Sequence, residues 1–188
     1  MSVGLLIDED DPVVWRGPVA QNTLTDLFGD VSWGPLDYLV VDLPPGTGDV
    51  QLTVLQHLPV TGTVVVTTPQ SVAVDDTRRG VQMFGEYRTN VLGVVENMSG
   101  FVCPSCGDTH DVFGEDGGRS LAEEVDVPYL GSLPLDPAIR TGAEDGEPVV
   151  ARGDGATAAA FRDLTGAVAN NVGVLRRRAR QRTAADGG

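Results

Sequence analysis

Short runs of almost exclusively apolar or β-branched residues constrain the fold of this 188-residue chain more than any other feature. A strand with one face in solvent alternates apolar and polar residues, whereas unbroken runs are typical of strands covered on both faces. Helical patterns separate these runs, which predicts right-handed βαβ units and a mostly parallel sheet flanked by helices, an α/β fold. We expect strands at residues 36–41, 62–67, 91–96 and 129–133, with a weaker one at 4–7, and helices at 49–58, 72–87, 118–125 and 156–175.

The stretch DLPPGTGD at residues 42–49 follows the first strong run. Ligands of parallel sheets bind beyond the carboxyl ends of the strands, so this stretch is placed to carry chemistry. Apolar residues followed by Asp42 have the form of a Walker B strand, whose carboxylate holds Mg²⁺ through water. A glycine a few residues later lets a backbone N–H approach a terminal phosphate. For Asp42 alone an ordinary turn is the better explanation, but the whole octapeptide favours a nucleotide.

Two later strand ends could contact a base. Asn97 follows the third strong run, and an amide side chain pairs with both a donor and an acceptor on a base edge. Pro134 follows the fourth run and could shape a base pocket. Turn formation alone also accounts for both residues.

Cys103 and Cys106 are the only cysteines of the chain, in the pattern C-P-S-C-G. A C-x-x-C-G loop lets both thiolates face one metal, yet two thiolates are half of the shell that zinc or an iron–sulfur cluster takes. A second copy of the chain could supply the other half across a two-fold axis. His110 is a further candidate ligand, although a loop role is the simpler interpretation. A thioredoxin-type dithiol is disfavoured because the pair lies in an apparent loop and not at a helix start.

All 13 basic residues are arginines, and the chain has no lysine. This composition excludes a Schiff-base lysine and the lysine of a P-loop within these residues. The formal net charge is −14, and such an acidic protein repels nucleic acid, so we expect no specific nucleic-acid partner. Acidic surface without lysine suggests a halophile with a high-salt cytoplasm. The alternative is an ordinary acidic protein from a GC-rich genome.

The sequence predicts a cytoplasmic protein without a membrane partner. It does not open with a basic and then apolar leader, and no apolar run approaches the ~20 residues of a membrane-spanning helix. We expect one domain over residues 1–175 and a basic, then flexible, tail over 176–188. Five arginines at 176–182 would interact favourably with the dipole at a helix C-terminus, and an anionic partner is the alternative.

Together these motifs resemble the C-terminal half of the Mrp/Nbp-type (ApbC-like) iron–sulfur cluster carrier ATPases, relatives of MinD and of nitrogenase iron protein. The resemblance extends over roughly residues 1–150, and its most specific part is DLPPGTGD followed by ENMS and CPSC. The matching stretches are WRGP at 15–18, WGPLDY at 33–38, DLPPGTGD at 42–49, TTPQ at 67–70, ENMS at 96–99, CPSCG at 103–107 and GSLPL at 131–135.

The resemblance implies a SIMIBI-type P-loop NTPase fold and a homodimer that bridges one labile [4Fe–4S] cluster for delivery to apo iron–sulfur proteins. It assigns roles to six residues. Asp42 is the Walker B residue for Mg²⁺, Gly46 lies in the switch that senses the terminal phosphate, Asn97 and Pro134 form the adenine pocket, and Cys103 and Cys106 bind the cluster.

The sequence departs from this family at one place. Members begin with a strand and a glycine-rich Walker A loop that carries two lysines, and this sequence contains neither. Backbone N–H groups and lysine in that loop supply most of the phosphate affinity. We therefore expect no independent ATP hydrolysis, with ATP and Mg²⁺ bound only when a P-loop is supplied. The chain would then be a fragment, half of a split protein, or a degenerate domain that retains the cluster.

Two alternative functions remain open from the sequence. Cys103 and Cys106 could clamp a dimer around zinc in an interaction protein that delivers nothing. The chain could also be a degenerate, non-ATPase subunit of a split ATPase. A partitioning ATPase of the MinD kind is disfavoured, because the CPSC motif has no purpose there and no amphipathic membrane helix is evident.

Overall fold

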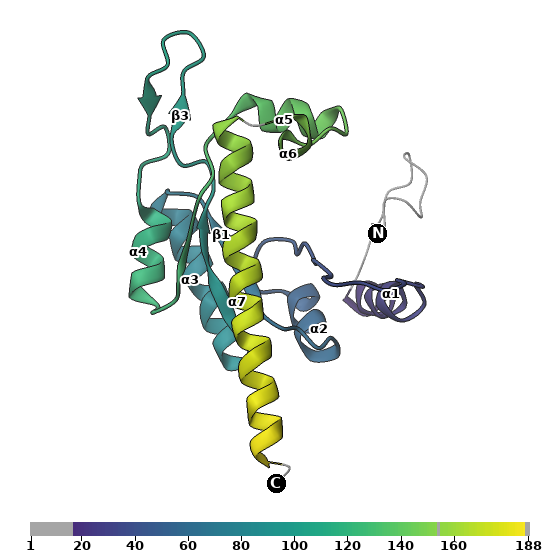
Figure 1. Ribbon diagram of the computed structural model, residues 1–188. Helices are drawn as coiled ribbons and strands as arrows, with labels where there is room; N and C mark the ends of the chain where they lie inside the picture. The colour runs from purple at the N-terminus through teal and green to yellow at the C-terminus, as the bar shows by residue number, and fades with distance from the viewer. Residues whose placement is uncertain (1–16, 154, 187–188) are drawn as a thin grey trace. The chain divides into compact units, whose positions relative to one another are not determined.

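Three of the predicted strands form a parallel sheet in the computed structural model, which describes residues 17–153 and 155–186 (Figure 1). The strands are β1 (Thr63–Thr67), β2 (Val91–Glu96) and β5 (Tyr129–Ser132), in the order β1-β2-β5. Central β2 is buried from its second residue to its last. Coverage on both faces therefore explains its continuous apolar sequence, as predicted.

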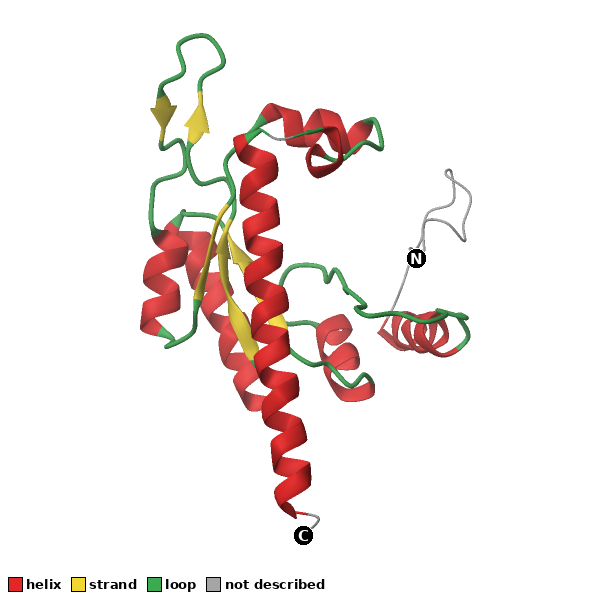
Figure 2. Cartoon of the chain, viewed as in Figure 1, coloured by secondary structure: helices red, strands yellow, loops and turns green. Residues whose placement is uncertain are grey.

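Helices cover both faces of this sheet (Figure 2). α3 (Ser71–Glu86) connects β1 to β2, and α4 (Gly117–Glu124) lies in the connection from β2 to β5. Both crossovers step in the same direction, so the right-handed rule places both helices on one face. α7 (Ala156–Asp186) packs against β2 and β5 on the other face, where Asn171 donates a hydrogen bond to the Leu92 carbonyl at 2.9 Å. The core beneath α3 and α4 centres on Val65, Val81, Val94 and Ala122.

Gly93 sits at an irregularity of the central strand. The register between β1 and β2 shifts by one residue here, which is the signature of a β-bulge. Its φ is +152°, and a Cβ at this position would lie 2.4 Å from the Pro128 carbonyl oxygen and 2.6 Å from Cγ of Leu130. Only glycine fits where the neighbouring strand approaches this closely.

The connection from β2 to α4 contains a small antiparallel hairpin made of β3 (Phe101–Val102) and β4 (Thr109–His110). It extends past the carboxyl edge of the sheet, away from the rest of its unit (Figure 1). We call residues 101–110 the cysteine hairpin, because Cys103 and Cys106 lie in its turn. After β5 the chain forms α5 (Pro137–Glu144) and α6 (Val149–Arg152) before it enters α7.

The chain divides into two compact units, Met1–Val60 and Thr61–Gly188, and the sheet belongs to the second. The first unit contains α1 (Gly17–Gly29) and α2 (Asp49–His57). The predicted strand at residues 36–41 is wrong: this segment is irregular, and Val40 is 89% exposed. A strand needs a hydrogen-bonded neighbour, and no described segment pairs with these residues. The weaker strand expected at 4–7 lies outside the described residues.

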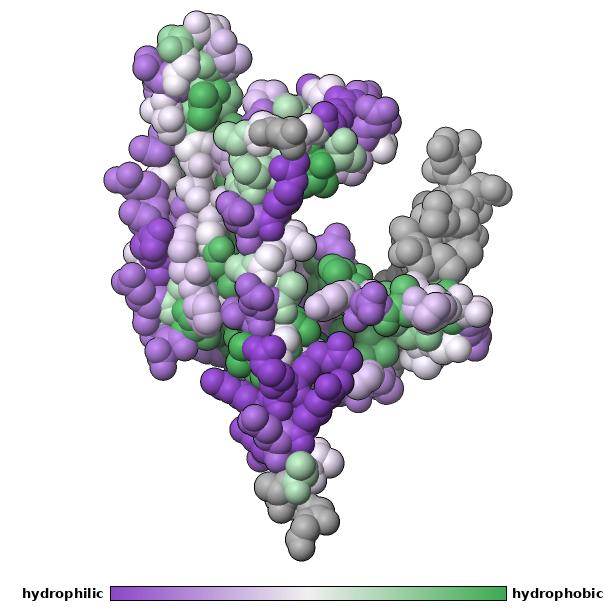
Figure 3. All heavy atoms as spheres, viewed as in Figure 1, coloured by the Kyte–Doolittle hydropathy of each residue, from purple (hydrophilic) through white to green (hydrophobic). Residues whose placement is uncertain are grey.

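The last helix is longer than its apolar pattern predicted. α7 continues beyond residue 175 through the arginines to Asp186, and its last turn contains no basic residue. Alanine, arginine and glutamine are good helix formers, so propensity sustains the helix after its packing face ends. The dipole explanation for the arginines is therefore wrong, because that interaction fades within the last turn. Figure 3 shows the hydrophilic surface of this part of α7. The predicted division at residues 175 and 176 stays a prediction.

Within the described ranges, no helix has both the length and the apolar character needed to cross a membrane.

Candidate functional site

The turn of the cysteine hairpin is closed by its own backbone. The Cys103 N–H donates to the Asp108 carbonyl at 2.8 Å, and the Gly107 N–H donates to the Cys103 carbonyl at 2.8 Å. Gly107 has a φ of +78°, a conformation that costs glycine little and other residues more. Both cysteines are free thiols, Cys103 half-buried and Cys106 exposed.

The turn also stabilises a thiolate at Cys103. Hydrogen bonds from the backbone N–H groups of Ser105 and then Cys106 lower the pKa of the Cys103 thiol, and the Cys106 side chain contributes further. Successive N–H groups directed at one anion resemble the nests that bind anions elsewhere in proteins. Because the thiolate is the metal-binding form of cysteine, the turn favours the state that a metal requires.

Among the residues that the structure describes, the two thiols have no third protein ligand nearby. Across residues 17–153 and 155–186, no group of three or more His, Cys, Asp or Glu side chains converges to hold a metal ion. His110 lies in β4 and is exposed, paired through the backbone with Phe101, so the loop position expected for it was wrong. One described chain therefore offers two thiolate ligands for a metal or cluster.

Asn97 and Pro134 come together at the carboxyl edge of the sheet. Asn97 follows β2 and Pro134 follows β5, and the Ser99 N–H donates to the Leu133 carbonyl at 2.9 Å between the two segments. The Asn97 Oδ1 accepts the N–H of Met98 at 2.9 Å. Among the described residues the Asn97 Nδ2 has no hydrogen-bond partner, so its N–H groups are available to a ligand. The arrangement is compatible with a base pocket, and the assignment stays a prediction.

Asp42 and Gly46 lie in the first unit, in an irregular segment that leads into α2. Both are exposed, and Gly46 has a φ of +98° with open space where a Cβ would stand. The loop is fastened by Gln51, which is 3% exposed and donates from Nε2 to the Pro44 carbonyl at 2.6 Å. The two residues expected near the phosphates thus share one loop, whereas the other four predicted site residues belong to the second unit.

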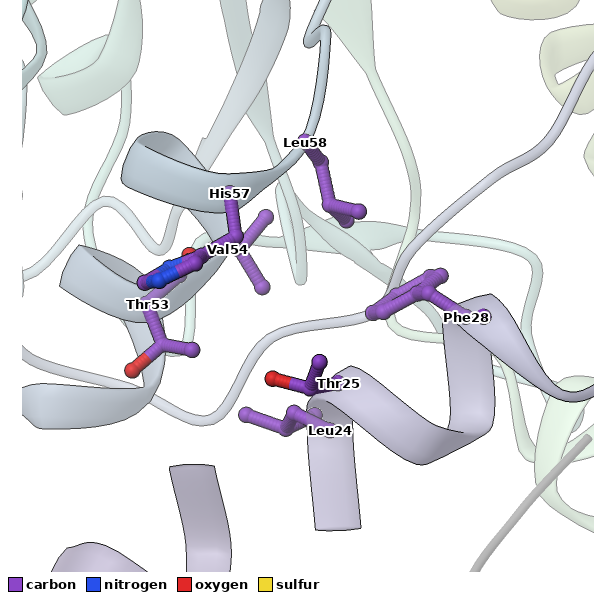
Figure 4. A pocket seen from close by; sticks show the side chains of 8 residues that line it. Leu24, Thr25, Phe28, Thr53, Val54, His57 and Leu58 are labelled. Atoms are coloured by element: carbon purple, nitrogen blue, oxygen red, sulfur yellow. The ribbon is translucent and has the colours of Figure 1, made fainter. Parts of the chain in front are cut away.

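The first unit also holds an apolar cavity of about 230 Å³ between α1 and α2 (Figure 4). Leu24 and Phe28 of α1 face Val54 of α2 and Leu58, which follows that helix. His57 lies at one side, with Nδ1 3.0 Å from the Thr53 carbonyl. None of the six predicted site residues lines this cavity. Its apolar lining is unlike a site for phosphates or metal.

Sequence reasoning gave no role to two buried polar residues beside the predicted site. Gln51 fastens the DLPPGTGD loop, and Glu96 is 1% exposed at the end of central β2. Glu96 could have been noticed as the single charged residue that ends an otherwise apolar run. Gln51 gave no such signal, because glutamine is common on amphipathic helices.

Solved structures with the same fold define the class of protein. A nucleotide-binding protein in complex with ADP from Archaeoglobus fulgidus is 37% identical, with a TM-score of 0.61 over 68% of this chain and 53% of that one. The cell division ATPase MinD of Pyrococcus furiosus aligns with a TM-score of 0.55 at 22% identity, covering 82% of this chain and 59% of its own, and supports the fold alone. The chain thus has an α/β fold of the SIMIBI P-loop NTPase type.

The family follows from the sequence match. Residues 1–169 match the ParA family model described as NUBPL iron-transfer P-loop NTPase, and the chain belongs to this family. An iron–sulfur cluster carrier protein of Synechocystis is 47% identical over 92% of the chain and 49% of its own length. The mouse iron–sulfur cluster transfer protein NUBPL is 49% identical over 80% of the chain and 47% of its own length. The chain spans about half the length of the curated relatives it matches.

Proposed function

We propose that this chain is an iron–sulfur cluster carrier, as its relatives' names describe them. The cysteine hairpin is the observation that carries the proposal. It presents two free thiols beyond the edge of the sheet, with the Cys103 thiolate stabilised by backbone N–H groups. A carrier must release its cargo to another protein, and an exposed cluster can be handed on where a buried one could not.

A second copy of the chain completes the ligand set in this proposal. One described chain supplies two thiolates, and a [4Fe–4S] cluster takes four. A two-fold axis passing near the cysteine hairpin brings Cys103 and Cys106 of each copy to one cluster. The cargo then bridges a homodimer, and its recipients are apo iron–sulfur proteins.

Nucleotide binding is the second part of the proposal. Asn97 and Pro134 would contact adenine, Asp42 would hold Mg²⁺ through water, and Gly46 would approach the terminal phosphate. The sequence has no lysine to grip the phosphates, so we propose that ATP and Mg²⁺ bind tightly only when a P-loop from outside these 188 residues is present. Titration of ATP and Mg²⁺ into the chain alone should show no micromolar affinity, and such an affinity would refute this part.

The setting of the carrier is also proposed. The net charge of −14 and the absence of lysine fit a high-salt cytoplasm in a halophile, haloarchaeal in origin. Salt reduces the Debye length to about 3 Å at 1 M, which relieves repulsion among the acids. Unfolding measured against KCl concentration should show stability rising with salt. Stability that is highest at low salt would contradict this setting.

Cluster transfer tests the function directly. The chain is reconstituted anaerobically with iron and sulfide, then mixed with an apo-ferredoxin acceptor that has its own visible circular dichroism spectrum, in the presence of an iron chelator. We expect the acceptor to fill faster than it does with equal free iron and sulfide, because the cluster passes between proteins without release. Stoichiometric zinc with no transferable iron would instead indicate a zinc-clamped interaction protein.

A further inference from the structure

Glu96 is the most deeply buried charged residue among those that the structure describes, and the proposed function gives it no part. It ends central β2, directly before Asn97 and five residues before the cysteine hairpin begins. A charge is costly to remove from water unless a specific partner compensates it. The partner of Glu96 is therefore informative about what the residue does.

That partner is a backbone N–H at the beginning of α4. Oε2 of Glu96 accepts the Gly118 N–H at 2.7 Å, across 22 residues of sequence. The first N–H groups of a helix have no intrahelical acceptor and usually receive one from a local N-cap side chain. Here the N-cap residue, Asp116, has a φ of +56° and makes no side-chain cap bond. Glu96 thus takes the place of the missing cap from the adjacent strand.

The bond joins the two ends of the segment that contains the cysteine hairpin. The chain leaves the sheet after Glu96 and packs against it again at Gly118, in the first turn of α4. The outgoing limb is held by backbone bonds, in which Ser99 donates to Leu133 and Leu135 donates to Gly100, both at 2.9 Å. For the returning limb, residues 111–118, the Glu96 carboxylate makes the sole hydrogen bond to the sheet in the described part of the chain.

Close packing makes this attachment precise. A Cβ at Gly118 would lie 3.0 Å from Cβ of Glu96 and 3.2 Å from Cγ2 of Thr67, and a Cβ at Gly117 would lie 2.4 Å from the Pro69 carbonyl oxygen. The first turn of α4 therefore rests directly on the ends of β1 and β2. Because no free space remains around this contact, the neighbouring atoms cannot shift to compensate for a small change at Glu96.

We propose that Glu96 is a positioning residue that tethers the returning limb of the cysteine hairpin to the sheet and so fixes the cysteines for cluster binding. This inference rests on the proposed function for its consequence, but not for the tether itself. A tethered hairpin loses less conformational freedom when its thiolates bind a cluster, so the cluster is held longer.

The test compares variants that change either the length or the charge of the side chain at position 96. Glu96→Asp keeps the charge but shortens the side chain by one methylene, whereas Glu96→Gln keeps the reach and an acceptor oxygen. The control is Glu124→Ala, at the other end of α4, where the exposed carboxylate pairs with Arg78 at 2.7 Å. Thermal unfolding of each variant verifies that it is folded.

The first measurement is amide hydrogen exchange of Gly118, Cys103 and Gly107 in the metal-free protein, which needs no cluster. We expect about tenfold faster exchange at Gly118 in Glu96→Asp, the size of a lost hydrogen bond to a charged group, and nearly unchanged exchange in Glu96→Gln. Wild-type protection in Glu96→Asp, or equal loss in Glu124→Ala, would overturn the tether whether or not the chain carries a cluster.

The second measurement is the rate at which the reconstituted protein loses its cluster to a chelator. Glu96→Asp should lose it about tenfold faster, while Glu96→Gln and Glu124→Ala stay within about threefold of the wild type. Unchanged loss in Glu96→Asp, despite faster exchange at Gly118, would refute the link between tether and cluster. If neither the wild type nor any variant takes up a cluster, the proposed function is refuted. The tether is then decided by the hydrogen-exchange measurement alone.

Discussion

At the scale of single residues, Cys103 provides a pH-dependent test. Backbone N–H groups of Ser105 and Cys106 hold the pKa of its thiol below the usual range. The thiolate therefore forms at lower pH in the folded protein than in the unfolded one. A depressed pKa of this kind stabilises the fold above the unfolded pKa, and the benefit is lost as pH falls through the folded pKa.

We expect alkylation of Cys103 by iodoacetamide in the metal-free protein to reach half its maximal rate at a lower pH than in the urea-unfolded chain. Mass spectrometry of the labelled peptide gives both profiles. Identical profiles in the folded and unfolded chain would show that the turn does not stabilise the thiolate.

Gly93 provides a stability test at the same scale. Gly93→Ala should lower the free energy of unfolding by about 2–4 kcal/mol, because the new Cβ would overlap the Pro128 carbonyl and Leu130 in the tightly packed centre of the sheet. The matched control is Gly80→Ala in the middle of α3, where no atom beyond the local backbone of the helix lies within 4 Å of the new Cβ. That change should raise stability by about 0.5–1 kcal/mol through helix propensity. Urea unfolding measures both, and a neutral Gly93→Ala would contradict the bulge geometry.

At the scale of elements, periodicity predicted the strands of the sheet and the helices that cover it, but it missed α1 and α5, which pack against other helices. The runs around Val65, Val94 and Tyr129 became the three strands of the sheet, because burial on both faces leaves a pattern in sequence. The run at residues 36–41 has an equally apolar pattern and did not become a strand. A strand depends on a neighbour elsewhere in the chain, and no local pattern reports whether that neighbour exists.

The arginine end of α7 gives a prediction for that element. Arg176 and Arg180 are spaced i, i+4, as are Arg178 and Arg182, and like charges at this spacing destabilise a helix. Arg176→Glu replaces one repulsion with an attraction and should stabilise the end of the helix by about 0.5 kcal/mol. Amide exchange over residues 176–186 measures the change. The gain should disappear in high salt, and a gain that persists there would exclude an electrostatic cause.

At the scale of the whole molecule, the residues of the predicted site belong to two units, with Asp42 and Gly46 in the first and the other four in the second. The CPSC pattern alone predicted that the two thiols share one turn, because residues three positions apart lie close together whatever the rest of the fold. The Glu96 bond could not be predicted, since it joins residues 22 positions apart through the fold. The roles proposed for Asp42 and Gly46 depend on other groups that bind the phosphates, and the 188 residues contain no lysine to do so.

The central claim is that two copies of this chain share one cluster through Cys103 and Cys106. Native mass spectrometry of the anaerobically reconstituted protein, with iron and sulfide analysis of the same sample, tests it most directly. We expect two chains with about four irons and labile sulfide. Cys103→Ser and Cys106→Ser should each abolish the iron, whereas Ser105→Ala, between the two thiols, should retain it. Iron bound by a single chain, iron retained without either cysteine, or a dimer holding zinc without sulfide would contradict the account.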